Sequence, residues 1–325
     1  MEPELYKYIK NECFSCRGGE LNELILHKQT NFKYLKCEGC QNLYHLDVSG
    51  CYELLELSCW GNKLKTVDVT HNRKLQKLNC SYNRIDSLNL HYNTQLNRLY
   101  CDSNSLSELN LSSNIHLKKI YCTRNHLTKI NIERNNDLVE LNCSYNHLSE
   151  LNLDHNYRLE WLQCSGNRLS NLNIEQNGHL NTLYISSNEL RYIDTSKNPL
   201  LKEIDCGYNS LKSLCLRKNL KLRELICKHN HIINIDITEN AALEYLDCTY
   251  NCIQKLDITN NEQLIGLWCS NNSIERLDLS RNLMLKHVCC ENNPLIELVV
   301  SMEQTKEDWF KKVIFDNPNL TIIVL

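Results

Sequence analysis

A cysteine recurs every twenty-one residues through most of this 325-residue chain, and this period constrains the fold more than any other feature. Ile185 takes the one missing place in the series, and an asparagine follows each position three residues later, from Asn62 to Asn293. A chain that repeats one short unit about a dozen times folds by stacking the copies, so the sequence predicts a repeat solenoid. The cysteines of the series are Cys59, Cys80, Cys101, Cys122, Cys143, Cys164, Cys206, Cys227, Cys248, Cys269 and Cys290.

Each unit contains two short segments with the alternation of a half-buried strand. Written from Leu75, the unit reads L-x-x-L-x-C-x-x-N-x-L-x-x-L-x-L-x-x-N-x-x. Leu78 and Cys80 alternate with polar residues, and Leu88 and Leu90 do so again ten residues later. We name the first segment strand A and the second strand B. Twenty-one residues leave no room for a long helix between them.

The unit resembles the leucine-rich repeat, because the signature L-x-x-L-x-L-x-x-N/C-x-L occurs twice in it, once with cysteine and once with leucine at the second strand position. It is most similar to the nested 21-residue class of bacterial leucine-rich repeats, called IRREKO repeats. The resemblance implies a leucine-rich-repeat solenoid that is mainly β, with two extended segments per coil and short helical caps at its ends. It names no ligand, because a fold does not specify a function.

The chain is expected to form one elongated domain with a cap at each end, since the ends of a solenoid expose core unless something covers them. Residues 1–20 form the predicted N-terminal cap, residues 21–300 a solenoid of about thirteen coils, and residues 301–325 a helix–strand cap. A short N-terminal amphipathic helix is predicted from Pro3, Leu5, Tyr8 and Ile9.

The C-terminal cap is predicted to begin with a helix that Thr305 caps, with Asp308 in its first turn. Asn317-Pro318 ends this helix, and residues 320–325 follow as a buried strand. The apolar face of the helix consists of Trp309, Phe310, Val313 and Ile314.

Charge and hydropathy exclude several classes of partner. A formal net charge of -3 and a pI near 6.5 give no basic surface for nucleic acid. No apolar run reaches the length of a membrane span, and the first ten residues lack the apolar core of a signal peptide. The expected location is the cytoplasm, with non-classical secretion left open.

Most of the nineteen cysteines are expected to be small buried hydrophobes. Twelve of them, Cys37 and the eleven of the series, occupy one inward position, which we name the cysteine ladder. Equivalent residues on neighbouring parallel strands lie ~4.8 Å apart, whereas a disulfide needs Cβ atoms ~3.8 Å apart, so ladder neighbours should remain thiols. A column of thiols fits a reducing compartment.

The N-terminal cysteines have a second interpretation. Cys13, Cys16, Cys37 and Cys40 form two C-x-x-C pairs with the spacing of a four-thiolate zinc site, which could fix the N-terminal cap. The repeat itself also accounts for Cys37 and Cys40, the first as a ladder residue and the second in place of the asparagine. Cys13 and Cys16 alone could be a redox dithiol. These alternatives stay open.

No motif in the sequence predicts catalysis. Phosphate-binding loops, the nucleophile-elbow motif and the helical H-E-x-x-H pattern are absent, and nine glycines leave little for a phosphate cradle. The histidines lie at turn or surface positions near asparagines. We therefore expect a non-enzymatic protein without a cofactor.

A comparison of the copies within the chain indicates where a partner would bind. The central exposed position of strand B is almost always Asp or Asn, which predicts a ladder of side-chain hydrogen bonds between coils. The exposed positions of strand A vary in size and charge, and they hold residue types that anchor protein interfaces. The predicted contacts on this strand-A face are Trp60, Arg98, Tyr100, Tyr121, Trp161, Gln163, Tyr184, Tyr245 and Trp268.

The sequence thus predicts a monomeric scaffold that binds a protein partner on the strand-A face. The alternative for this face is that its aromatic residues only pack along the sheet. Two alternative functions remain: a metal- or redox-responsive protein that uses the N-terminal cysteines, and a secreted effector or adhesin built on the same solenoid.

Overall fold

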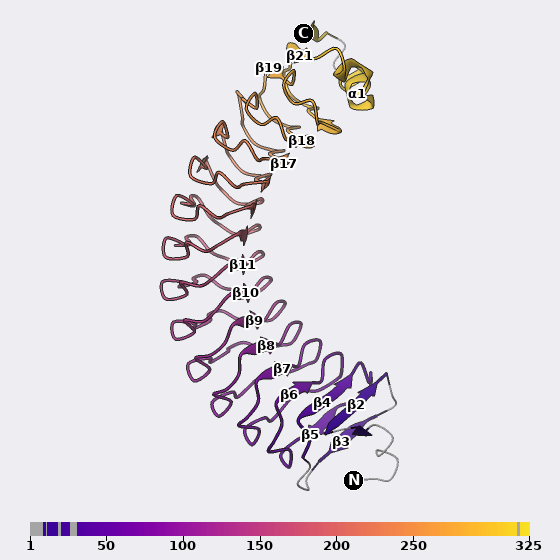
Figure 1. Cartoon of the computed structure of the whole chain (residues 1–325), viewed down its shortest axis with the longest axis vertical. Helices are drawn as coiled ribbons and strands as arrows, with labels where there is room; N and C mark the ends of the chain where they lie inside the picture. The colour runs from indigo at the N-terminus through magenta and orange to yellow at the C-terminus, as the bar shows by residue number, and fades with distance from the viewer. Residues whose placement is uncertain (1–8, 11, 19–20, 27–30, 317–318) are drawn as a thin grey trace. The chain divides into compact units, whose positions relative to one another are not determined.

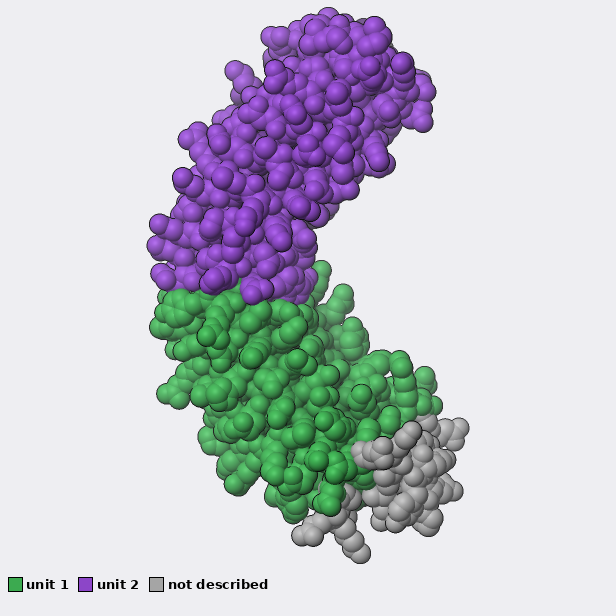
Figure 2. All heavy atoms as spheres, viewed as in Figure 1, with its two compact units in different colours: residues 1–159 green, residues 160–325 purple. Residues whose placement is uncertain are grey.

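The computed structural model describes residues 9–10, 12–18, 21–26, 31–316 and 319–325. The chain divides into two compact units, residues 1–159 and residues 160–325 (Figure 2). Each unit is a stack of coils in which short parallel strands repeat at a spacing of 21 residues (Figure 1). The predicted leucine-rich-repeat solenoid is confirmed.

In the first unit, the strand-A segments form a parallel sheet that begins near the N-terminus. Leu78 pairs with Leu99, and Leu99 pairs with Ile120, so equivalent residues stand in register. At the edge, β1 (Ile9–Lys10) runs antiparallel to the first of these strands. The strands are β2 (Cys13–Arg17), β4 (Tyr34–Glu38), β6 (Glu56–Ser58), β7 (Lys77–Asn79), β8 (Arg98–Tyr100), β9 (Lys119–Tyr121) and β10 (Glu140–Asn142). The strand-B segments are β3 (Glu23–Ile25) and β5 (His45–Asp47), followed by single bridges.

The second unit repeats this arrangement. Its strand-A segments are β11 (Trp161–Gln163), β12 (Thr182–Tyr184), β13 (Glu203–Asp205), β15 (Glu224–Ile226), β17 (Tyr245–Asp247), β18 (Gly266–Trp268) and β20 (His287–Cys289). Its strand-B segments are β14 (Ser213–Cys215), β16 (Asn234–Asp236), β19 (Arg276–Asp278), β21 (Glu297–Val300) and β22 (Thr321–Val324). Strands of only three or four residues suffice because each is paired with its neighbours along the stack.

Within each unit, the core is a stripe of leucine, isoleucine and cysteine side chains. The ladder cysteines are at most 2% exposed, and Ile185 is buried at the same position. Burial raises the pKa of the Cys80 thiol to about 12, because the charged thiolate loses its hydration. The ladder therefore consists of neutral thiols that pack as small hydrophobes.

Two columns of asparagine join neighbouring coils by hydrogen bonds. In the column that follows strand A, the Asn104 amide donates to the carbonyls of Cys80 and Cys101 at 3.0 and 3.1 Å and accepts from the Ile85 N–H at 3.0 Å. In the column that follows strand B, the Asn114 amide donates to the carbonyls of Leu90 and Asn93. Asn104 thus uses both ends of its amide, whereas Asn114 uses the nitrogen.

The backbone turns sharply after strand A in every coil. The residue two places after the ladder cysteine has a positive φ, as at Tyr82 (56°), Arg124 (52°) and Tyr208 (54°). This left-handed conformation points the backbone N–H at the next coil, where that of Tyr82 donates to the Asp102 carbonyl at 2.7 Å. The tyrosines at this position are therefore part of the turn.

The predicted hydrogen-bond ladder along strand B is wrong. The Asp and Asn side chains of this column accept hydrogen bonds from the backbone N–H two residues ahead in their own coil, as Asp257 does from Thr259 at 3.0 Å and Asn110 does from Ser112 at 3.1 Å. The side-chain oxygen of Asp or Asn reaches this donor within its own turn. The column is therefore uniform because nearly every coil forms the same local hydrogen bond, and not because the side chains bond to one another.

The predicted C-terminal helix forms, but it begins differently from the prediction. Helix α1 (Asp308–Asp316) packs on β20, burying Trp309, Phe310 and Val313, while Ile314 is half-buried. Thr305 does not cap this helix: it lies in the 3-10 turn η2 (Gln304–Lys306), where its hydroxyl donates to the Met302 carbonyl.

The predicted final strand forms, but its burial was predicted wrongly. Strand β22 pairs with β21 at the edge of its sheet, and Val324 is 43% exposed. An edge strand with no layer above it keeps its side chains in solvent. The helix stop at residues 317–318 lies outside the described residues.

The predicted N-terminal helix also falls largely outside the described residues, which do not include Pro3, Leu5 or Tyr8. Ile9 lies in the antiparallel strand β1 instead. Strand β2, within the segment predicted to be a cap, already pairs in parallel with β4 of the first coil. The domain boundaries themselves stay a prediction.

Candidate functional site

The residues predicted to bind a partner lie on the exposed side of the strand-A segments or just after them. Side chains alternate along a strand, so the central leucine of β8, β11 and β17 is buried. The residues on either side of this leucine are half-buried or exposed. Trp60 follows β6 and is separated by β7 from the next predicted contacts. The nine residues therefore do not form one contiguous group, and the two units are described separately.

In the first unit, Tyr100 and Tyr121 form a small aromatic cluster. They are direct partners on β8 and β9, and their ring centroids lie 5.2 Å apart at 36°. The Tyr121 hydroxyl donates to Glu140 at 2.7 Å, and the Glu140 carboxylate also accepts from Lys119 at 2.6 Å. Arg98 lies exposed on the same strand as Tyr100. The cluster thus has rings held in place, with a cation beside them.

Burial and hydrogen bonding set the ionisation of this cluster. Burial raises the pKa of Tyr121, and the hydrogen bond to Glu140 raises it further. Burial alone would raise the pKa of Glu140, but the hydrogen bonds from Lys119 and Tyr121 outweigh it and lower that pKa. At neutral pH the tyrosine is therefore a neutral donor and the glutamate a charged acceptor.

In the second unit, Trp268 lies flat on the sheet because its neighbour has no side chain. A Cβ atom added to Gly266 would stand 2.5 Å from two carbons of the Trp268 ring and 3.2 Å from the Tyr245 ring. The indole also stacks on His287, with centroids 6.4 Å apart at 14°. Tyr245, Trp268 and His287 therefore form a second cluster, which Gly266 makes possible.

Sequence reasoning missed Gly266 and His287. The signal was present, because among the strand-A segments from Glu56 to Cys289 only Gly266 places a glycine at the first position, which elsewhere holds a larger residue. A glycine at an exposed strand position marks a close approach of another group. The approach of Trp268 depends on the direction of its side chain, which the repeat pattern does not specify.

The remaining predicted contacts lie among acidic neighbours. Trp161 and Gln163 lie on β11, and Gln163 is the direct partner of Tyr184. The Tyr184 hydroxyl donates to the Glu203 carboxylate. Burial raises the pKa of the adjacent Glu224, and the charges of Glu203 and nearby Asp205 raise it further.

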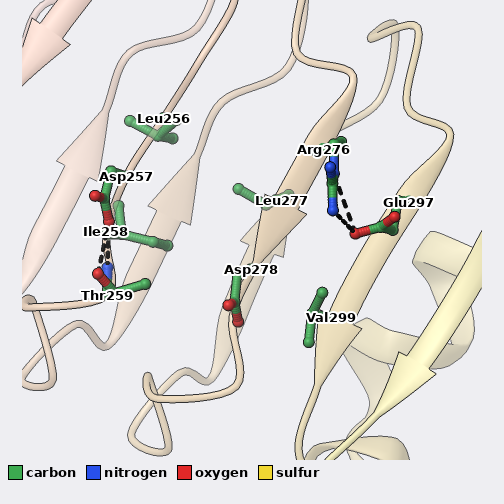
Figure 3. A pocket seen from close by; sticks show the side chains of 9 residues that line it. All are labelled: Leu256, Asp257, Ile258, Thr259, Arg276, Leu277, Asp278, Glu297 and Val299. Carbon is green, nitrogen blue, oxygen red and sulfur yellow. Dashed lines mark hydrogen bonds and ion pairs between the residues drawn. The ribbon is translucent and has the colours of Figure 1, made fainter.

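A shallow hollow of about 270 Å³ lies on the strand-B side, away from the predicted face (Figure 3). Arg276 and Glu297 form an ion pair in it, at 2.6 Å. Asp257 and Asp278 accept hydrogen bonds within their own turns. Its polar groups therefore already have partners, and the hollow offers no converging set of groups to a ligand. Its lining consists of Leu256, Asp257, Ile258, Thr259, Arg276, Leu277, Asp278, Glu297 and Val299.

The four N-terminal cysteines do not converge on one point. Cys13 and Cys16 are three residues apart on β2, so strand alternation directs them to opposite faces, with Cys13 half-buried and Cys16 buried beside Cys37. Within the described ranges, no group of three or more His, Cys, Asp or Glu side chains is placed to hold a metal ion. The sulfur atoms of Cys16 and Cys40, in contrast, lie 3.7 Å apart.

Within the described residues, no helix has the length and apolar character needed to span a membrane.

Comparison with known proteins places the chain in a family. No protein-family model and no curated protein matches it. Among solved structures, it is 30% identical to the functional domain of InlJ from Listeria monocytogenes, described as including a cysteine ladder, over 89% of this chain and 67% of that one, with a TM-score of 0.77.

Two more distant structures share the fold. A leucine-rich repeat protein of Leptospira interrogans is 18% identical, over 92% of this chain and 88% of that one, with a TM-score of 0.74. The plant peptide hormone receptor RGFR1 in complex with RGF2 is 18% identical, over 90% of this chain and 62% of that one, with a TM-score of 0.63. The repeat signature, the parallel solenoid and the identity to InlJ together show that the chain belongs to the leucine-rich repeat proteins.

Proposed function

We propose that this chain is a non-enzymatic scaffold that binds a protein partner through its strand-A face. The observation that carries the proposal is the half-buried, pre-positioned indole of Trp268, which packs over Gly266 and stacks on His287. Aromatic residues held in one conformation lose little entropy on binding, and they dominate the energetics of protein interfaces.

The contrast between the two sides of the solenoid supports the choice of face. On the strand-B side, the exposed column repeats Asp or Asn because each side chain completes its own turn. On the strand-A side, the same local bond forms only where the central residue is Asn or Asp, as at Asn79 and Asp205. In several other coils this position holds tyrosine or tryptophan, and aromatic rings gather in clusters around Tyr100 and Trp268. A face whose residue type varies from coil to coil is the better candidate for recognition.

The fold itself is compatible with a protein ligand, since the same solenoid occurs in a plant receptor in complex with a peptide hormone. We further propose that the scaffold is monomeric, needs no cofactor and acts in the cytoplasm, where its column of thiols is stable. The absence of any catalytic motif from the sequence supports a binding role.

Replacing Trp268 by alanine is expected to weaken partner binding by about 2 kcal/mol, roughly thirtyfold, because a central aromatic anchor is lost. Gly266→Ala should also weaken binding, although it keeps the indole, because its Cβ would displace the ring. Affinity capture from the extract of expressing cells with wild-type protein identifies the partner, and titration calorimetry then measures each variant.

Tyr192→Ala is the matched control for these variants. Tyr192 is 56% exposed and precedes the strand-B position Asp194, so its loss removes an exposed aromatic ring from the other side of the coil. Circular dichroism verifies that all variants are folded. Equal binding by wild type, Trp268→Ala and Gly266→Ala would assign the aromatic residues to sheet packing alone.

A further inference from the structure

Cys40 interrupts the asparagine column at the first coil. It follows the ladder residue Cys37 by three positions, as Asn83 follows Cys80. In later coils, the asparagine amide donates to the carbonyl 24 residues earlier, as Asn83 does to Cys59 at 2.9 Å. The Cys40 sulfur lies 3.9 Å from the equivalent carbonyl of Cys16, too far for a strong hydrogen bond. The substitution therefore weakens a bond between coils and places a thiol there.

This thiol meets a second one. The Cys16 sulfur is 3.7 Å from the Cys40 sulfur, and the two side chains are 2% and 0% exposed. A disulfide requires a separation of about 2.05 Å, so the sulfur atoms need to approach by less than 2 Å. Neighbours within the cysteine ladder are held apart by the strand spacing of ~4.8 Å. Cys16 and Cys40 lie 24 residues apart and do not occupy equivalent positions, so the strand spacing does not set the distance between their sulfur atoms.

The other nearby thiols are worse partners for Cys16. Cys37 is its direct partner on the adjacent parallel strand, where equivalent side chains point the same way at the strand spacing. Cys13 faces away from Cys16, on the other side of β2.

We propose that Cys16 and Cys40 form a reversible disulfide that fastens β2 to the first coil. With a low-molecular-mass disulfide such as glutathione disulfide as oxidant, one protein thiol loses its proton and attacks, forming a mixed disulfide and releasing one glutathione thiolate. The second protein thiol then loses its proton and displaces the second glutathione thiolate. The protein loses two electrons and two protons, and glutathione disulfide becomes two glutathione molecules.

The consequence of the bond is a locked N-terminal end. Strand β2 carries Phe14, fully buried and in edge contact with Phe32 at 6.3 Å, so it covers the core of the first coil. In the thiol form, hydrogen bonds to β4 and apolar packing hold β2 in place. A covalent bond between the two segments restricts their separation and slows opening of this end.

Mapping the bond in the full-length folded protein tests the proposal. After incubation in an oxidising glutathione buffer, we expect the number of thiols measured after denaturation to fall by two. Alkylation and digestion after Lys, Arg and Glu then separate Cys37 from Cys40, because Glu38 lies between them. The expected product joins the peptide of Cys16 to the peptide of Cys40, also in a Cys13→Ser variant.

Cys40→Asn is the decisive variant, because it restores the residue that later coils carry at this position and should therefore fold. It should lose the two-thiol change, whereas the matched Cys37→Ser variant should keep it. Oxidation should slow hydrogen exchange of the β2 amides in wild type and not in Cys40→Asn. A bond from Cys16 to Cys37, a bond involving Cys13, or an unchanged thiol count in the oxidising buffer would overturn the proposal.

Discussion

Raising the pH from about 9 to about 12 is expected to unfold this solenoid far more steeply than an ordinary protein of its size. Burial raises the pKa of Cys80, Cys164 and Cys248 from 9.0 to about 12 and also raises the pKa of other ladder thiols, such as Cys59 and Cys101. The folded state therefore favours neutral thiols, whereas the unfolded chain ionises near pH 9.

The direction follows from proton binding. Below pH 9 the thiols are neutral in both states, and their packing contributes fully to stability. Between pH 9 and pH 12 the unfolded state loses protons that the folded state retains, so each ladder thiol lowers the free energy of unfolding by about 1.4 kcal/mol per pH unit. Several thiols acting together would exhaust a stability of 5 to about 15 kcal/mol within one or two pH units.

Urea titrations at successive pH values measure this slope. Replacing Cys80, Cys164 or Cys248 by valine should reduce it by about 1.4 kcal/mol per pH unit for each substitution. An aliphatic side chain is tolerated in the ladder, as Ile185 demonstrates. Cys215→Val is the control, since this thiol is exposed and its removal should leave the slope unchanged. A free energy of unfolding that stays constant from pH 9 to pH 11 would refute the explanation.

Asn104→Ala is expected to destabilise the protein by about 2 kcal/mol. The substitution leaves the Ile85 N–H without its partner. It also removes one of the two amide donors at the carbonyls of Cys80 and Cys101, which keep Asn83 and Asn125. A buried donor that loses its partner costs roughly 1 to 3 kcal/mol, and a carbonyl that keeps a second donor loses less. Urea unfolding at neutral pH measures the change.

The strand-B column provides an internal comparison. Asn114→Ala removes two hydrogen bonds to carbonyls, but it also removes an amide oxygen that is buried and, in the described part of the chain, accepts no hydrogen bond. We therefore expect about half the loss seen for Asn104→Ala. Asn110→Ala, at an exposed turn position, should change stability by about 0.5 kcal/mol or less. Equal losses for Asn104 and Asn114 would contradict this account.

The repeat pattern predicts every feature that depends on which way a side chain points along a regular strand. Leu78, Cys80 and Asn83 are inward in the structure as the period requires, because alternation and the 21-residue spacing leave them no other place. The pattern fails where local geometry decides. The Asp257 side chain accepts a hydrogen bond within its own turn. Hydrogen bonds between coils would have produced the same column of Asp and Asn along strand B, so the sequence could not distinguish the two arrangements.

The candidate site lies at the limit of what the sequence can predict. Tyr100 and Tyr121 occupy equivalent positions one period apart, so their contact follows from the repeat alone. Trp268 packs over Gly266 two residues away on its own strand, and Cys40 meets Cys16 at an offset of 24. Neither contact joins equivalent positions, so a search by period does not find them.

Because the asparagine hydrogen bonds recur at regular offsets, the number of coils in this protein can change without loss of these bonds. The Asn83 amide connects to Cys59 across 24 residues and to Leu64 across 19, and the strands pair across 21. Removing or duplicating 21 residues maps every donor onto an equivalent acceptor. The single extra residue between β4 and β6 instead moves the bonds of one coil to other offsets, as for Asn62 and Cys37 across 25 residues. Whole coils can therefore be gained or lost, and with them the extent of the strand-A face, without redesigning the core.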